Sequence, residues 1–360
     1  MATRSVFPSR VPLTITAALL VVVLGSLLSC RKYPTQPIES TSSSPFLGDP
    51  GTQVTATNDA GLITWLTTGT DIAFESLSHY GPAILGPLKM VNINSMSVVV
   101  LDGTVQSVGT MDAEGDSLFY NGGSEPAGSA FFVVVPGAAN PKPSIVSGPG
   151  GVISPDCKLA ASVDFTGDSL LLTHMPDRTV QAFPILPGEL PVRFSPDSRR
   201  LLISTGRILD VADGSLTTVP FPLPDIRALT WTADGIWALT VSQNPTSSPM
   251  TLDVYTVTNL MTGQSREIWR STATDMMGFE FAMSKDGKRV AFLRCTPMNI
   301  VPTVHYLYVC DIPGGTTTQL LSVAVRLGVG AIPGIDSFSF SPEGKRIAYA
   351  VEGNIYYSDL

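Results

Sequence analysis

A ten-residue pattern recurs seven times along the chain and constrains the fold more than any other feature of the sequence. Each copy begins with an aromatic or large apolar residue, continues through a polar turn such as S-P-D-S, and ends in an apolar run. The copies follow one another at intervals of about 37 to 57 residues, at Trp65, Met111, Ile153, Phe194, Trp231, Met283 and Phe340. Pro presets φ, Asp bonds nearby backbone and Gly permits positive φ, so each copy predicts a tight turn between two β-strands.

Further strand-like segments follow most copies. Third strands are predicted in SVVVLDG from Ser97, AFFVVVP from Ala130, HYLYVCD from His305 and NIYYSDL from Asn354, and a weaker fourth in TTTQLLS from Thr316. Four short strands roughly every 40 residues are typical of a β-propeller blade. The sequence therefore predicts an all-β, seven-bladed β-propeller with four antiparallel strands per blade. Six blades remain an alternative, because WLTTGTDIAF and WTADGIWALT match the pattern poorly.

The last copy leaves its blade one strand short. FSPEGKRIAYAVEGNIYYSDL provides three strands, and the sequence then ends. QVTAT, at Gln53 to Thr57, precedes the first copy and belongs to no earlier blade. Because an unpaired strand edge promotes unwanted association, we expect this N-terminal strand to complete the last blade and close the ring.

The repeat resembles the WD40-like, or PD40, repeat of the TolB-like propellers. FSPEGKRIAY, MSKDGKRVAF and FSPDSRRLLI carry the resemblance, which extends over residues 52–360. It implies a propeller domain that docks other molecules in the bacterial cell envelope.

The N-terminus has the layout of a secretory signal. MATRSVFPSR carries two positive charges and no acid, a continuous apolar run follows, and LLSC ends at Cys30. This arrangement resembles a bacterial lipoprotein signal, which implies a signal peptide over residues 1–29 and a diacylated Cys30. Arg31 stands where an inner-membrane retention signal would have Asp, so we expect the outer membrane, facing the periplasm, if the source is Gram-negative. An uncleaved membrane anchor remains an alternative.

Residues 30–51 are rich in Pro, Ser and Thr and predict a tether between the lipid and the propeller domain at residues 52–360. The first 29 residues contain two of the 22 basic residues and no acid, so the rest of the chain carries a net charge of about −10. That charge argues against nucleic acid or anionic lipid as partners. We expect a monomer that is attached to the membrane only by its lipid.

The predicted loops sort onto two faces of the ring. Turns of the S-P-D-G kind lie on one face, and the longer connections lie on the other: Glu75 to Met96, Ser242 to Met250, Arg270 to Gly278, Arg294 to Val304 and Ala324 to Ile335. Insertions that gather on one face favour a binding role for that face. The candidate partner-binding residues are His79, Tyr80, Asp275, Met276, Met277, Arg294, Met298 and Arg326.

Motifs for catalysis or cofactor binding are not apparent. The three histidines divide between the faces, His79 and His305 on the long-loop face and His174 on the other, which argues against a three-histidine metal site. DAEGD, from Asp112, could bind calcium, but it coincides with a blade turn. The turn carboxylates are interpreted as structural: Asp156, Asp197, Asp234, Asp286 and Glu343. We expect no cofactor.

Beyond Cys30, the cysteines are expected to be free and mostly buried. Pairing RVAFLRC with HYLYVCD places Cys295 beside His305 and Cys310 beside Val290, too far apart along the strands for a disulfide. Cys157 lies three blades away.

Two functions follow from this sequence. The first is a non-enzymatic envelope lipoprotein whose propeller binds a protein or a glycan. The alternative is an envelope enzyme, a lactonase, lyase or hydrolase, with its site in the central channel. Inward positions of the innermost strands look apolar or hydroxylated, which favours binding.

Overall fold

The computed structural model describes residues 45–76, 86–103, 110–114, 117–122, 130–134, 142–147, 151–164, 166–175, 177–221, 226–244, 252–270, 276–295, 303–312, 315–325 and 334–360. These residues form seven four-stranded antiparallel sheets and no helix. No helix of the described residues is thus long and apolar enough to cross a membrane. The all-β, seven-bladed prediction is confirmed.

Each blade contributes one strand to each of four concentric layers. The innermost strands are β2 (Ala60–Trp65), β6 (Thr110–Glu114), β10 (Val152–Ile153), β14 (Pro191–Phe194), β18 (Ile226–Thr232), β22 (Met276–Met283) and β26 (Ile335–Phe340). The second strands are β3 (Asp71–Ser76), β7 (Ser117–Gly122), β11 (Leu159–Val163), β15 (Arg200–Ile203), β19 (Gly235–Asn244), β23 (Arg289–Cys295) and β27 (Arg346–Val351). The third strands are β4 (Leu88–Asn92), β8 (Ala130–Val134), β12 (Ser169–His174), β16 (Arg207–Asp210), β20 (Leu252–Asn259), β24 (Thr303–Asp311) and β28 (Asn354–Asp359). The outer strands are β5 (Val98–Asp102), β9 (Lys142–Ser147), β13 (Val180–Pro184), β17 (Leu216–Thr218), β21 (Ser265–Arg270), β25 (Thr317–Val325) and β1 (Thr52–Gln53).

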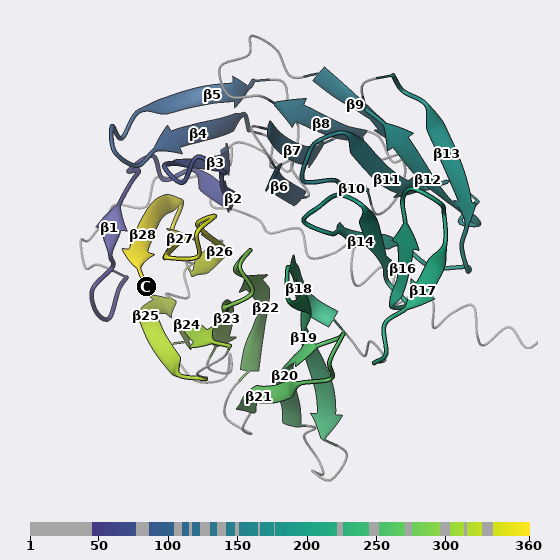
Figure 1. Ribbon diagram of the computed structural model, residues 1–360. Helices are drawn as coiled ribbons and strands as arrows, with labels where there is room; N and C mark the ends of the chain where they lie inside the picture. The colour runs from purple at the N-terminus through teal and green to yellow at the C-terminus, as the bar shows by residue number, and fades with distance from the viewer. Residues whose placement is uncertain are drawn as a thin grey trace, which may run out of the picture.

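The innermost strands surround the centre of the ring (Figure 1). All seven predicted repeat positions fall within these strands, and all except Met111 are the last or next-to-last residue, where the strand enters its turn. The turns after the innermost strands define one face, here called the turn face. The connections that lead into the innermost strands define the opposite loop face.

The ring closes between the two ends of the domain, as predicted. β1 pairs with β28, with Thr52 opposite Tyr357 and Gln53 opposite Tyr356. Beyond β1, the amide of Val54 donates to the carbonyl of Ile355 at 2.7 Å. The seventh blade therefore takes its fourth strand from the start of the domain, and its edge is covered.

Hydrophobic clusters occupy the seams between neighbouring blades. One cluster joins blades 6 and 7 through residues such as Leu307 and Tyr349, and another joins blades 7 and 1 through Ile355 and Phe74. Similar clusters fill the seams between blades 1 and 2, 3 and 4, 4 and 5, and 5 and 6. Each blade is thus stabilised by contact with its neighbours, because one four-stranded sheet cannot bury both of its faces alone.

The S-P-D turns share one hydrogen-bond network. In blade 4, the Ser195 hydroxyl donates to Asp197 at 2.5 Å and accepts from the amide of Arg200 at 2.9 Å. Asp197 also accepts from the amide of Arg199 at 3.2 Å. Ser154 with Asp156 and Ser284 with Asp286 repeat this pattern in blades 3 and 6. These aspartates are structural, as the sequence predicted.

Residues 45–51, which we call the strap, add a fifth segment to blade 6 before the chain enters β1. The amide of Ala324 donates to the carbonyl of Pro45 at 2.9 Å, and the amide of Leu47 donates to the carbonyl of Ser322 at 3.0 Å. The Phe46 ring lies 4.9 Å from that of Tyr356 in an edge-to-face arrangement. The last residues of the segment interpreted as a tether therefore lie against the ring.

Blade 1 corrects one strand assignment. SVVVLDG forms the fourth strand, β5, whereas the third strand is β4, inside the segment interpreted as the loop from Glu75 to Met96. β4 is short and partly polar, and it follows Gly86 and Pro87, so its sequence lacks the alternation expected of a strand.

Candidate functional site

Bulges interrupt the innermost strands near the loop face. The pairing register shifts between Pro191 and Arg193 in β14, between Ile226 and Ala228 in β18, and between Ile335 and Ser337 in β26. β2 and β22 have similar shifts. A bulge leaves a residue out of the ladder and re-aims its side chain. Five blades therefore depart from regular pairing at the end of the channel that opens on the loop face.

Three of the bulged segments contain a charged residue. Arg227 is the extra residue of β18, Asp336 is the extra residue of β26, and Glu280 lies within the longer bulge of β22. Arg193 lies beside the bulge of β14. Blades 4 and 5 thus each carry an arginine at this end of the innermost strand, and blades 6 and 7 each carry a carboxylate.

This finding corrects the expectation that inward positions of the innermost strands are apolar or hydroxylated. The expectation holds for Ser337 and Ser339, whose hydroxyls accept hydrogen bonds from the amides of Ile63 and Trp65 in blade 1 at 3.2 and 3.1 Å. It fails where bulges add charged residues. The alternation of apolar and polar residues that predicts a strand does not show where a bulge will form. The charged residues were therefore visible in the sequence but could not be assigned to the channel.

A cleft of about 470 Å³ lies between blades 4 and 5. The lining combines apolar residues with two arginines and a hydroxyl: Val192, Arg193, Ser204, Ile226, Arg227, Ala228 and Leu229. These residues come from the loop-face ends of β14 and β18 and from the connection after β15. A concave surface that combines apolar side chains with a few polar groups can bind a ligand.

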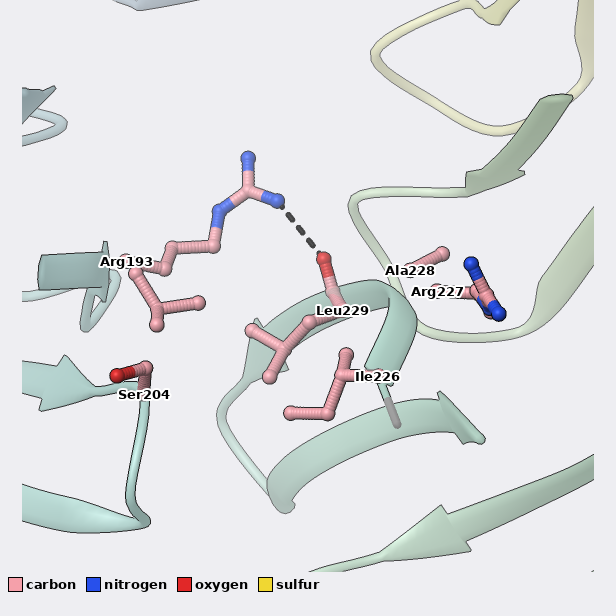
Figure 2. A pocket seen from close by; sticks show the side chains of 7 residues that line it. Arg193, Ser204, Ile226, Arg227, Ala228 and Leu229 are labelled. Carbon is pink, nitrogen blue, oxygen red and sulfur yellow. Dashed lines mark hydrogen bonds between the residues drawn. The ribbon is translucent and has the colours of Figure 1, made fainter. Parts of the chain in front are cut away.

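The two arginines of the cleft have different surroundings. Arg193 spans from blade 4 to blade 5, where its guanidinium donates to the carbonyl of Leu229 at 3.0 Å. Figure 2 shows this bond, with Arg227 on the other side of Leu229. Arg227 is exposed to solvent at the edge of the cleft. Both guanidiniums favour an anionic group, since their fixed forks of donors match carboxylate geometry.

Glu280 is a carboxyl with a perturbed environment. The side chain remains accessible to solvent, yet burial among surrounding protein atoms raises the pKa of its carboxyl above the ordinary value. Desolvation disfavours the charged form of a carboxyl. Glu280 is therefore more easily protonated than an ordinary surface glutamate.

A lysine connects distant blades at the turn face. Lys285, in the turn of blade 6, donates from Nζ to the carbonyl of Ala113 in blade 2 at 2.6 Å. These blades lie on opposite sides of the ring centre (Figure 1). The side chain thus crosses the central channel at its turn-face end.

The structure places three of the predicted partner-binding residues. Met276 and Met277 open the innermost strand β22 instead of lying in a loop, and Met277 stands opposite Arg294 in the register. The other five lie outside the described residues: His79, Tyr80, Asp275, Met298 and Arg326. Their role in binding remains a prediction.

Arg294 belongs to strand β23 and packs within the blade. Its guanidinium lies 5.5 Å from the centre of the Tyr306 ring, a cation–π distance, and donates to the Tyr308 hydroxyl at 3.2 Å. These contacts hold Arg294 against its own sheet. They give it a structural role whether or not a partner also reaches it.

The thiols agree with the sequence-based expectation. Cys157, Cys295 and Cys310 are not in disulfides; Cys310 is buried and the other two are partly buried. Cys295 pairs with His305, and Cys310 with Val290, as expected. Burial raises the pKa of the Cys295 thiol to about 11, so the thiol is protonated at neutral pH and is a poor nucleophile.

Within the described part of the chain, no three His, Cys, Asp or Glu side chains lie close enough to hold a metal ion. The side chains of Asp112, Glu114 and Asp116, considered above for calcium, lie outside the described residues.

The seven sheets form a β-propeller. Its candidate site is the cleft between blades 4 and 5, at the loop-face ends of the innermost strands. No protein-family model and no curated protein sequence matches the chain. Among solved structures, an oligogalacturonate lyase in complex with manganese is similar, with 13% sequence identity over 91% of this chain and 98% of the lyase and a TM-score of 0.60. An oligogalacturonate lyase from Vibrio parahaemolyticus is 12% identical over 85% of this chain and 92% of its own, also with a TM-score of 0.60.

The C-terminal WD40 domain of Sif2 is similar as well, with 12% identity over 89% of this chain and 99% of that domain and a TM-score of 0.50. Propellers described as TolB also match, with lower TM-scores. The chain therefore has the β-propeller fold of the lyases and of the WD40 domain, as its repeats predicted. At these identities the likeness shows the fold alone.

Proposed function

We propose that this protein is a lipid-anchored propeller of the bacterial cell envelope that binds a partner bearing carboxylates, a protein or a glycan, at the loop face. The observation that carries the proposal is the cleft between blades 4 and 5, where Arg193 and Arg227 border an apolar surface. Attachment through a diacylated Cys30 is part of the proposal and rests on the signal-like N-terminus.

The charge distribution supports an anionic ligand at this position. The domain is acidic overall, so an anion approaching at random is repelled. Two arginines at the edge of one cleft place positive charge there, and charged hydrogen bonds to carboxylates are about twice as strong as neutral ones. The cleft therefore favours carboxylate groups over neutral ligands.

A matched pair of substitutions tests this function. Arg227→Glu reverses a charge in the cleft, and Arg199→Glu makes the same change in the exposed turn of blade 4 on the opposite face. Isothermal titration with a glutamate-rich peptide, an oligogalacturonate and a neutral oligosaccharide measures the affinity of each variant. We expect Arg227→Glu to weaken binding of the acidic probes by roughly tenfold or more, as losing a charged contact costs about 1.5–3 kcal/mol. Equal affinities of the two variants would contradict the cleft as the site.

An envelope enzyme remains the second candidate, and Glu280 is the observation that favours it. A carboxyl with a raised pKa at the mouth of a channel suits a general acid. The similarity to oligogalacturonate lyases suggests an acidic oligosaccharide as the substrate to try. Incubating the protein with oligogalacturonate and separating the products by size tests this candidate. Cleavage by the wild type that Glu280→Gln abolishes would favour the enzyme, whereas binding without cleavage would favour the binding module.

A further inference from the structure

The outer strand of blade 1 has the composition of a buried strand. β5 begins with a run of valines, Val98 to Val100, and an unbroken apolar run is typical of a strand inside a sheet. The sequence accordingly predicted it as a third strand, but it is the fourth and lies at the rim of the ring (Figure 1). Val98, Val99 and Val100 are 42%, 50% and 56% exposed. Apolar surface that would be covered inside a sheet therefore faces solvent.

The other outer strands carry features that limit pairing with a second chain, namely charge, proline, shortness or a covering segment. β1 and β17 are only two and three residues long. β25 is covered by the strap, through Phe46. The remaining outer strands contain prolines or charged residues: Pro143 in β9, Pro184 in β13, and Arg266 and Glu267 in β21.

β5 lacks these features at its outward edge. Its charged residue, Asp102, is buried and accepts a hydrogen bond from the Tyr120 hydroxyl at 2.5 Å, so its charge does not protect the edge. Among the described residues, no segment pairs with the outward side of β5. The pairing of Phe46 with Val323 shows that an outer strand of this propeller can accept an extended segment in antiparallel orientation. β5 offers an edge of the same kind.

The backbone of β5 directs hydrogen-bonding groups outward at Val98 and Val100. The amide of Asn92 donates to the carbonyl of Ser97 at 3.1 Å, which makes these two residues a hydrogen-bonded pair of β4 and its neighbour. Such pairs alternate with non-hydrogen-bonded ones along an antiparallel ladder. Val99 is therefore bonded to β4, whereas the amides and carbonyls of Val98 and Val100 point away from it.

We infer that two copies of this chain pair through β5, antiparallel and across a two-fold axis at Val99. In this register Val98 of each copy lies opposite Val100 of the other, so the outward amides and carbonyls of both residues are bonded. Val99 of one copy faces Val99 of the other. Moving the axis to Val98 or Val100 would leave outward groups and exposed valines without a matching valine. The edge is thus complementary to itself, as a two-fold interface requires.

Charge and position agree with a second copy as the occupant. The valine run contains no charged residue, so the net negative charge of the two copies is kept out of the contact. β5 belongs to blade 1, whereas the cleft lies between blades 4 and 5. The inference therefore does not depend on the proposed function.

Cysteine substitutions in the full chain, held in an excess of detergent micelles, test the register. Val99→Cys places the new thiols in a non-hydrogen-bonded pair, with Cα atoms about 4.5 Å apart, within reach of a disulfide. Val98→Cys places them on a diagonal, with Cα atoms about 8 Å apart, too far for one. After mild oxidation we expect at least about fivefold more disulfide-linked dimer from Val99→Cys than from Val98→Cys or the wild type. Mixing Val98→Cys with Val100→Cys should restore crosslinking, because these positions lie opposite each other.

Sedimentation in the same detergent measures association without added thiols. We expect the wild type to form dimers as its concentration rises, with the weak affinity of a small interface. Val99→Lys places like charges opposite each other and should raise the dissociation constant about tenfold or more. Val180→Lys is the matched control in β13, at a position 56% exposed, and should leave the constant unchanged. Mixing Val99→Lys with Val99→Glu should restore association, because opposite charges then face each other.

Three results would overturn the inference. The first is equal crosslinking of Val98→Cys and Val99→Cys, and the second is equal weakening by Val99→Lys and Val180→Lys. The third is a wild type that stays monomeric up to its solubility limit. If that monomer binds a synthetic SVVVLDG peptide, the edge accepts a strand from another protein and not from a second copy. Circular dichroism of each variant separates loss of pairing from loss of the fold.

Discussion

Replacing Gly51 by alanine tests whether ring closure depends on the turn between the strap and β1. Gly51 has a φ of +71°, where a non-glycine residue costs about 1–3 kcal/mol. An added Cβ would also lie 2.5 Å from both the Tyr357 carbonyl oxygen and the Ser358 hydroxyl oxygen and 2.6 Å from the Tyr349 hydroxyl. The Tyr357 oxygen belongs to the backbone of β28, which is paired on both sides and cannot shift easily. The turn at residue 51 would therefore have to move to relieve the contact.

We expect Gly51→Ala to lower the free energy of unfolding by about 2–4 kcal/mol, combining the backbone cost with the close contact. For a domain of this size that corresponds to a fall in Tm of roughly 5–10 °C, measured by circular dichroism. Gly48→Ala is the matched control three residues earlier, because a Cβ there meets no atom within 4 Å. The control should change stability by less than about 0.5 kcal/mol. Equal stability of the two variants would refute the reasoning about closure.

Three further predictions concern stability. Leu202→Ala removes a fully buried side chain from the seam between blades 4 and 5 and should cost about 2–5 kcal/mol in chemical unfolding, whereas Leu216→Ala, at an outer position 37% exposed, should cost far less. Ser195→Ala removes the buried hydroxyl of the blade 4 turn and should cost about 1–3 kcal/mol; an unchanged unfolding midpoint would show that the turn network does not stabilise the blade. Burial raises the pKa of Asp59, but hydrogen bonds from Lys89, Ser76 and Thr57 outweigh it and hold the pKa below its usual value. The stability that Asp59 contributes is therefore present above about pH 4 and lost as the pH falls below it, so urea unfolding should show a smaller acid-induced loss in Asp59→Asn than in the wild type.

The sequence by itself determined the repeat architecture. The conformation of the polar turn between two strands depends only on nearby residues, because Ser, Pro, Asp and Gly determine the backbone dihedral angles within a few residues. Ser195 and Asp197 perform in the structure the roles that their residue types predict. Ring closure could also be predicted, since a blade that lacks one strand must find it elsewhere in the chain.

The tertiary structure alone decided which charged residues share the channel mouth. Arg227, Glu280 and Asp336 lie more than 50 residues apart in sequence, and bulges that depend on packing between blades bring them to the same end of the ring. The strap is a second case: the sequence around Phe46 reads as a tether, and only the shape of the seam between blades 6 and 7 gives that ring a place to pack. Local residue preferences fix turns and strands, whereas the direction of a re-aimed side chain or of a docked segment depends on surfaces built by distant parts of the chain.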